Sequence, residues 1–426
     1  MYLAHCLLLL LAGLLVLSQG QLHPELHGQR HTHRPHQEAP GTAEGSPSLK
    51  VTAGNTAFAL RFYHLLASQP YGDNIFFSPL SISSAYAMLS LGVRAHSQTQ
   101  ILEGLGFNLT EVSESDIHRG FRNLLHALHL PGDRLEIRVG SALFLRPELP
   151  LLPSFLNDSA TFYESKLFRM GFEDTVGTSK FINDHVRAET RGKIVDLVST
   201  LSPDTVMVLV NFMYFKALWE KPFIPSMTAL HDFYVDEGTT VKVPMMLQDT
   251  QHHWYFHDRY LPCSVLRMDY KGNATALFIL PNRGKMEQVE EVLTPEMITR
   301  WNKLLRKRYF YRKLKLYIPK FSISGSYKLD QILPRLGITD LFSQRADLSG
   351  ITEQLNLQVS KSFHKAILEV DEVGTQAAVA TGGFVTFWSR HNHEVLRFNR
   401  PFLVGIFSTN TQSILFLGKV VNPTKP

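Results

Sequence analysis

The segment from Glu369 to Arg397 constrains the fold of this chain more than any other stretch. It begins with alternating apolar and acidic residues, a pattern typical of the end of a β-strand. Beyond Gly374, the residues up to Ala380 are mostly small, uncharged and free of proline. Such a segment can lie in solvent. It can also enter a β-sheet, because it has no proline to interrupt the hydrogen bonds and no large charge to bury.

Three short stretches indicate a known family. The sequence E-V-G-T-Q-A-A-V-A at 372–380 resembles the hinge of the reactive-centre loop in inhibitory serpins. F-N-R-P-F at 398–402 resembles the serpin signature, and L-G-K-V-V-N-P at 417–423 resembles the serpin C-terminus. The resemblance extends over residues 48–426, and the three matches together are specific to this family.

The resemblance implies an α+β serpin fold in a single domain, residues 48–426. This fold has a large central sheet called sheet A, two further sheets, about nine helices and an exposed reactive-centre loop, here residues 371–397. The residue pattern agrees with a mixed domain, since 48–67 has helical periodicity. The segments with strand-like patterns are Ser141–Leu145, Met207–Phe215, Tyr255–Met268 and Ala274–Leu280.

The first 47 residues are expected to lie outside this domain. Residues 1–20 contain the apolar run of a signal peptide, which is too short to anchor the chain in a membrane, although no Lys or Arg precedes it. Residues 21–47 are rich in His and Pro and predict a disordered tail, with metal binding by the histidines as an alternative. The protein is therefore expected to be secreted and extracellular, without membrane insertion.

The cysteines and the Asn-x-Ser/Thr sequences depend on this export. Cys6 lies in the signal peptide, so Cys263 has no partner within the secreted chain. We expect a buried, inert thiol, with an intermolecular disulfide as the alternative. Three asparagines are candidates for glycosylation in an exported protein: Asn108, Asn157 and Asn273.

The resemblance assigns five residues to the region where sheet A opens. Ser78 and Ser81 match the serpin shutter segment, although a Ser-Pro sequence at this point also fits a buried helix cap. His364 matches the shutter histidine and is expected to bond Asn211. Trp219 is expected to cover the breach, where the loop first inserts. A His and an Asn can also form an ordinary structural pair in the core.

A strongly basic segment begins at the end of a predicted helix. This helix starts with Thr294 as its cap, Pro at the first position and Glu in the first turn, and it is expected to end in Arg306, Lys307 and Arg308. No acidic residue occurs between Trp301 and Leu329, and a strand with alternating Lys and apolar residues follows the helix. A solvated face is the simpler interpretation. In an exported protein, the composition favours heparin or another sulfated glycosaminoglycan over nucleic acid. The expected contacts are Lys303, Arg306, Lys307, Arg308, Arg312, Lys313 and Lys315.

The resemblance further implies that the chain inhibits a serine protease as a suicide substrate. Cleavage is expected at the Trp388–Ser389 bond, with Phe387 in the adjacent specificity pocket and Arg390 as an alternative residue for the primary pocket. The freed loop would insert into sheet A as a new strand and trap the protease as a covalent acyl complex. The implied target is tissue kallikrein or a chymotrypsin-like enzyme, and an indole suits the apolar pocket of the latter. The hinge residues are Gly374, Thr375, Gln376, Ala377 and Ala378.

Other functions fit the residues less well. A non-inhibitory serpin that carries a small hydrophobic ligand remains an alternative. Catalysis by Ser389 with His391 or His393 lacks the elbow sequence and the oxyanion hole that such an enzyme needs, so no enzymatic activity is expected. Neither a cofactor nor a metal ion is implied, and the protein is expected to be a monomer.

Overall fold

The structure is a computed structural model of the 426-residue chain. It describes residues 46–69, 72–129, 135–354, 357–374 and 394–426. All of them belong to one compact unit that extends from Glu44 to Pro426. In this part of the chain, no helix is both long and apolar enough to cross a membrane. The predicted signal peptide, the tail at 21–45 and the reactive-centre loop at 375–393 lie outside the described residues.

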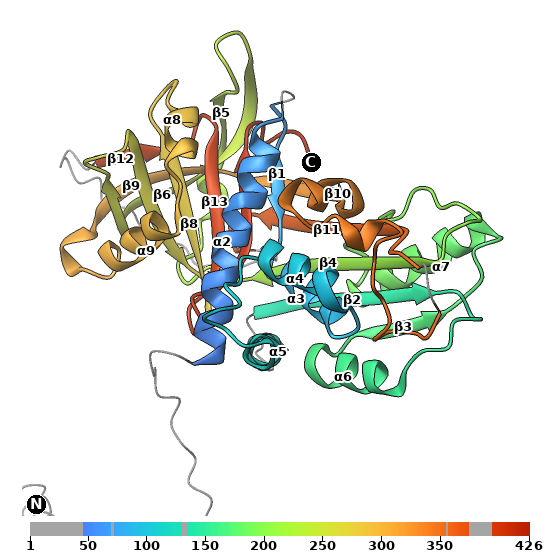
Figure 1. Ribbon diagram of the computed structural model, residues 1–426. Helices are drawn as coiled ribbons and strands as arrows, with labels where there is room; N and C mark the ends of the chain where they lie inside the picture. Colours follow the sequence, from blue (N-terminus) through green and yellow to red (C-terminus); the bar gives the residue numbers. More distant parts are fainter. Residues whose placement is uncertain (1–45, 70–71, 130–134, 355–356, 375–393) are drawn as a thin grey trace, which may run out of the picture. The chain divides into compact units, whose positions relative to one another are not determined.

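A five-stranded mixed sheet forms the expected sheet A (Figure 1). Its central contact is a parallel pair between β11 and β4, whose register runs from Lys361 opposite Val208 to Ile367 opposite Tyr214. The β4–β2 and β10–β11 pairs are antiparallel, and β2–β3 is parallel. In spatial order, the strands are β10 (Phe321–Lys328), β11 (Lys361–Val370), β4 (Met207–Ala217), β2 (Leu135–Leu145) and β3 (Lys166–Arg169).

The two further sheets expected from the sequence are continuous with each other in one nine-stranded, hydrogen-bonded network. Strand β6 joins them, and its pairing with β9 shifts register between Gln248 and Gln251. In chain order the strands are β1 (Ile75–Phe77), β5 (Ala229–Tyr234), β6 (Thr240–His257), β7 (Cys263–Asp269), β8 (Ala274–Pro281), β9 (Tyr311–Pro319), β12 (Glu394–Arg397), β13 (Phe402–Ser408) and β14 (Ile414–Val420).

Nine α-helices accompany the sheets in the described residues, and a side-chain cap followed by proline explains where three of them begin. Ser46, Ser78 and Thr294 each accept a hydrogen bond from a backbone N–H of the first turn. Each cap is followed by a proline, whose fixed φ suits the first helical position. The helices are α2 (Pro47–Ala67), α3 (Pro79–Ser90), α4 (Ala95–Gly104), α5 (Glu114–His129), α6 (Pro153–Tyr163), α7 (Thr175–Glu189), α8 (Met286–Glu291), α9 (Pro295–Leu304) and α10 (Leu329–Ile332).

Four short 3₁₀ turns complete the regular structure of the described residues: Pro225–Met227, Arg308–Phe310, Leu333–Leu336 and Asp340–Phe342. The predicted helix at 48–67 and the strands at 141–145 and 207–215 are present within α2, β2 and β4. The expected strand Tyr255–Met268 is instead two strands, β6 and β7, with a reversal at 258–262. Asp258 caps this reversal by accepting the Tyr260 backbone N–H at 2.9 Å.

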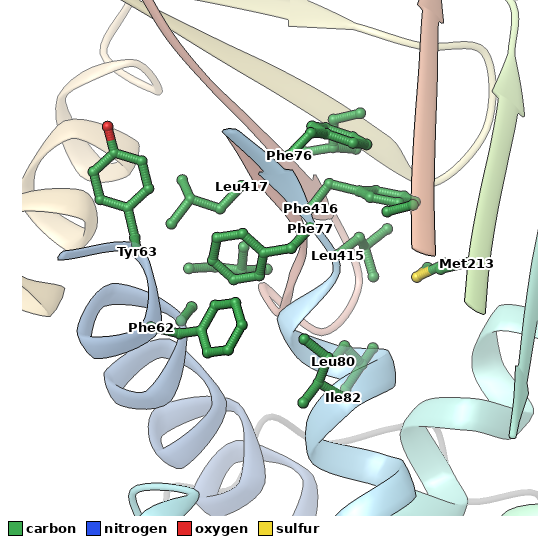
Figure 2. Packing of buried hydrophobic residues seen from close by; sticks show 14 of the residues in the cluster. Phe62, Tyr63, Phe76, Phe77, Leu80, Ile82, Met213, Leu415, Phe416 and Leu417 are labelled. Atoms are coloured by element: carbon green, nitrogen blue, oxygen red, sulfur yellow. The ribbon is translucent and has the colours of Figure 1, made fainter. Parts of the chain in front are cut away.

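The main core packs α2 and α3 against the nine-stranded sheet (Figure 2). Phe62 of α2 contacts Phe77 of β1, with ring centroids 4.7 Å apart. Phe76 stacks on Phe416 of β14 at 5.1 Å, and Met213 brings β4 of sheet A to the edge of the same cluster. This apolar contact fixes α3 directly behind the centre of sheet A, which positions the polar residues described next.

Candidate functional site

The first residues of the predicted hinge form a tight reversal at the end of β11. Both Val373 and Gly374 donate their backbone N–H to the Asp371 carboxylate, at 3.0 and 2.9 Å. The Asp371 N–H donates to the Gly374 carbonyl at 3.0 Å. Gly374 then forms an antiparallel bridge with Leu218, one residue beyond the end of β4. The chain has therefore turned back beside β4 before the loop begins.

Gly374 is required by this geometry. Its φ of +131° lies in the region that favours glycine. A Cβ atom here would lie 2.2 Å from the Ala217 carbonyl oxygen and 2.7 Å from the Leu218 Cα, both of which belong to the backbone. The predicted role of this glycine as a pivot therefore has a local structural reason.

Trp219 covers the reversal, as the sequence predicted. Its side chain is 1% exposed and stacks on Tyr270 with ring centroids 4.1 Å apart. The indole Nε1 donates to the Asp371 carbonyl at 3.0 Å, and the backbone N–H donates to the Val373 carbonyl at 2.9 Å. One residue thus closes the end of the β11–β4 pair and contacts the start of the hinge.

Asn211 connects three elements at the middle of sheet A and is completely buried. Its Oδ1 accepts hydrogen bonds from Ser81 Oγ at 2.9 Å and from His364 Nδ1 at 2.7 Å. Its Nδ2 donates to the Ser81 carbonyl at 2.8 Å and to Ser141 Oγ at 3.2 Å. The predicted His364–Asn211 bond is confirmed, and it crosses the parallel β11–β4 pair.

The partners of His364 determine its protonation. The Ser78 backbone N–H can only donate, and it points to His364 Nε2 at 3.1 Å. Nε2 is therefore the acceptor, and Nδ1 carries the proton given to Asn211. Complete burial lowers the pKa of His364 from 6.5 to about 3, against a smaller raising effect of Asn211. Ser78 is also the N-cap of α3, which confirms the helix-cap interpretation of this serine, and its shutter role stays a prediction.

This burial predicts a loss of stability in mild acid. Because the folded-state pKa of about 3 is below the unfolded value of 6.5, the stabilisation is present above pH 6.5 and is lost as pH falls toward 3. We expect the free energy of unfolding to decrease by about 1.4 kcal/mol per pH unit in this window because of His364 alone. Urea unfolding at several pH values between these limits measures the effect.

His364→Gln provides the control for this prediction. The Gln amide can accept from Ser78 and donate to Asn211 but does not titrate. The pH slope of this variant should be shallower than that of the wild type by the His364 contribution. His253, whose pKa burial lowers to about 4, is present in both proteins and cancels in the difference. Equal slopes would contradict the assignment.

The basic segment lies on α9, the turn after it and β9, but its members are not equivalent. Helix α9 ends at Leu304, so Arg306 and the next two cations lie in the following turn, not in the helix as the sequence suggested. Among the expected contacts of this segment, all of which the structure describes, five cations are exposed and have no ion pair: Lys303, Arg306, Lys307, Arg308 and Lys313. These five residues are called the free cations below.

Two expected contacts are engaged by acids from distant parts of the chain. Arg312 lies on the opposite side of β9 from Lys313, over the Tyr255 ring at 4.8 Å, and is 3.9 Å from Glu394. Lys315 is 3.7 Å from Asp249. Lys320, directly after β9, pairs with Glu372 of the hinge reversal at 2.9 Å. The segment itself contains no acidic residue, but the fold brings acidic residues from other parts of the chain next to it.

Several site residues were not predicted. Tyr86 of α3 donates its hydroxyl hydrogen to Ser362 of β11 at 2.6 Å, and Tyr327 of β10 stacks on His364. These contacts join residues far apart in sequence, and no local pattern indicates them. Asp371 could have been found, because Asp three residues before Gly is a recognisable turn sequence.

The remaining expected residues have mixed outcomes. Phe387, Trp388, Ser389 and the hinge residues 375–378 lie outside the described residues. Asn108, Asn157 and Asn273 are exposed, as glycosylation would require, and their glycosylation stays a prediction. Cys263 is buried and free, and burial raises the pKa of its thiol to about 12, so the inert interpretation is favoured.

The geometry agrees with the comparison to known families. The profile of the serpin (serine protease inhibitor) family matches residues 53–423. The chain is a serpin. The family model that matches describes serine protease inhibitors rather than enzymes, which confirms that expectation from the sequence.

Human kallistatin is 69% identical to this serpin over 427 residues, with 100% of each chain covered. The crystal structure of human glycosylated kallistatin has 70% identity and a TM-score of 0.85, covering 90% of this chain and 100% of that chain. The crystal structure of cleaved kallistatin complexed with heparin has 72% identity and a TM-score of 0.75, covering 77% and 96%. This serpin is thus kallistatin-like in sequence and fold.

Proposed function

We propose that this serpin is a suicide substrate whose loop, once cut, inserts between β11 and β4. The observation that supports this most is the antiparallel bridge between Gly374 and Leu218. A strand that continues from Gly374 would run antiparallel to β11, because the chain has reversed, and therefore antiparallel to β4 as well. One parallel pair would be replaced by two antiparallel pairs, which are slightly more stable per residue.

The free energy of insertion comes from new backbone bonds and buried side chains. About a dozen residues would join the sheet, each with a net gain on the order of 1 kcal/mol. Thr375, Ala377 and Val379 share one side of the new strand and are small enough to be buried there. A gain on the order of ten kcal/mol is sufficient to move and distort a tethered protease before the acyl bond is hydrolysed.

The proposed scissile bond is Trp388–Ser389, with Phe387 beside it. Incubation with tissue kallikrein and with a chymotrypsin-like protease, followed by mass analysis, tests both the bond and the target. We expect a covalent adduct and a released peptide that begins at Ser389. A peptide that begins after Arg390 would instead assign the primary pocket to Arg390. Complete cleavage without any adduct would contradict the suicide mechanism.

A second proposed activity is heparin binding by the free cations. A relative with 72% identity has been crystallised in complex with heparin, and five exposed cations without acid partners are available here. Sulfate groups would attract them through charge, so affinity should depend strongly on salt. Arg312 and Lys315 should contribute less, because each already lies beside a carboxylate.

The salt dependence gives a quantitative prediction. The logarithm of the heparin association constant should fall linearly with the logarithm of the salt concentration. Lys307→Ala and Lys313→Ala should each make this negative slope shallower by roughly 0.9, as for a cation that neutralises one DNA phosphate. Lys180→Ala, an exposed lysine of α7 that pairs with Asp184, is the matched control and should leave the slope unchanged. Calorimetric titration with heparin at several salt concentrations measures it. A salt-independent affinity would exclude the proposed mode of binding.

We also propose that the protein is exported and glycosylated. The apolar N-terminal run and three exposed Asn-x-Ser/Thr sequences support this, as does the glycosylated human relative. The carrier function remains the alternative to inhibition. It requires no loop insertion, so the thermal test described in the Discussion separates the two.

A further inference from the structure

A cavity of 260 Å³ lies where β6 passes between β7 and β9, beside the chain that leaves β4. Its walls combine two kinds of groups: flat rings and cations. The rings belong to Trp254, Tyr311 and two histidines, and the cations belong to Lys221 and Arg267. None of these residues belongs to the shutter, to the hinge reversal or to the free cations.

The strands around this cavity contain an unusual number of unsatisfied groups. In the described residues, four buried side-chain nitrogen and oxygen atoms lack a hydrogen-bond partner. Three of them belong to β6 and β9: Gln248 Oε1, His253 Nε2 and Arg312 Nε. His253 lines the cavity and is only 4% exposed. A buried polar atom without a partner in the chain is costly, so His253 Nε2 is available to a water molecule or a ligand in the cavity.

The cations of the cavity are held in place and have hydrogen bonds to spare. Lys221 Nζ donates to the His252 carbonyl and to the Tyr311 hydroxyl, both at 2.7 Å. An ammonium group has three N–H bonds, so one remains for a ligand. Arg267 Nε donates to Asp269 at 2.7 Å, and its two terminal nitrogens have no hydrogen-bond partner among the described residues. Both groups can therefore bind an acidic ligand.

The acids of the cavity do not cancel this preference. Asp269 Oδ1 already accepts from Arg267 and, at 2.9 Å, from Thr275. Glu220 is exposed to solvent, which screens its charge. Burial, followed by Lys221 and His252, lowers the pKa of His253 to about 4. Its imidazole is thus neutral at pH 7 and can either donate to or accept from a ligand.

The aromatic walls favour a planar molecule. Trp254 and Tyr311 lie with ring centroids 4.7 Å apart, and His252 stacks on Tyr311 at 5.3 Å. A protein cavity of about 150 Å³ can hold benzene, so the larger volume here admits a two-ring molecule. We propose that this cavity binds a small aromatic acid, with its ring beside Trp254 and Tyr311 and its carboxylate or sulfate group at Lys221 and Arg267.

Calorimetric titration of the full-length protein with indole-3-acetate and with indoxyl sulfate tests the proposal and compares the two acidic groups. Indole, which lacks the acid, and sodium sulfate, which lacks the ring, are the controls. We expect saturable one-to-one binding of at least one aromatic acid. Both controls should bind at least about tenfold more weakly, since each lacks half of the proposed interaction.

Variants identify the site. Lys221→Met and Arg267→Met should each weaken binding of the aromatic acid by about tenfold, whereas Lys180→Met on α7 should not change it. The melting temperature of each variant shows whether it is folded. Absence of saturable binding at millimolar concentration overturns the proposal. So does wild-type affinity in a folded Lys221→Met protein, or a crystal soaked with either acid that shows only ordered water in the cavity.

Discussion

Thr375→Arg should convert this serpin from an inhibitor into a substrate. Residue 375 follows the Gly374–Leu218 bridge directly. It alternates in step with the small residues Ala377 and Val379, which are expected on the buried side of the inserted strand. A guanidinium group there would enter the apolar interior of sheet A without a partner, at a cost of several kcal/mol. We expect the yield of covalent complex to fall at least about tenfold, while cleavage of the loop continues.

Gln376→Arg is the matched control. It introduces the same charge at the next residue, whose side chain would lie on the outer side of the strand. This variant should retain most of its inhibition. Denaturing gels of the protease mixture distinguish complex from cleaved protein in both cases. Full complex formation by Thr375→Arg would show that insertion does not begin at this residue.

Cutting the loop should raise the melting temperature by more than about 10 °C. The estimate follows from a gain on the order of ten kcal/mol on insertion and from the entropy of unfolding of a domain of this size. A protease that cuts near residue 388 without being trapped can prepare the nicked protein, and differential scanning calorimetry compares it with the intact form.

The same measurement decides between inhibitor and carrier. A serpin whose loop does not insert would melt at about the same temperature before and after the cut. Nicked Thr375→Arg provides an internal control, since it has the same cut but should insert poorly. If the intact protein, the nicked protein and the nicked Thr375→Arg variant all had the same melting temperature, both the insertion and the trapping mechanism would be contradicted.

Local patterns predicted those features that depend on neighbouring residues. Thr294 caps α9, Ser78 caps α3, and from Lys313 to Ile318 the residues of β9 alternate between more exposed and buried positions, as expected. The family resemblance supplied the long-range pairs, including His364 with Asn211 and Trp219 with the hinge. No periodicity in this chain would have connected these residues.

The errors arose where distant segments meet. Glu394 and Asp249 approach Arg312 and Lys315, so an apparently uniform basic surface is divided into free and paired cations. Strand β6 pairs with both β7 and β9 and so makes two expected sheets continuous. The ion pairs and the continuity of the sheets both depend on pairing between strands far apart in the chain. The residues of one segment do not show which distant residues will lie beside it.

The direct ladder between β11 and β4 has a consequence for how long the native molecule survives. The proposed insertion of the loop must first break this ladder, the His364–Asn211 bond that crosses it and the Asp371 turn at its end. The ladder, the hydrogen bond and the turn would all have to break in the same opening step, so each adds to the activation barrier of that step. Under the proposed mechanism, the working lifetime of the protein is set by a rate of opening, and storage conditions should be chosen by kinetics instead of by equilibrium stability.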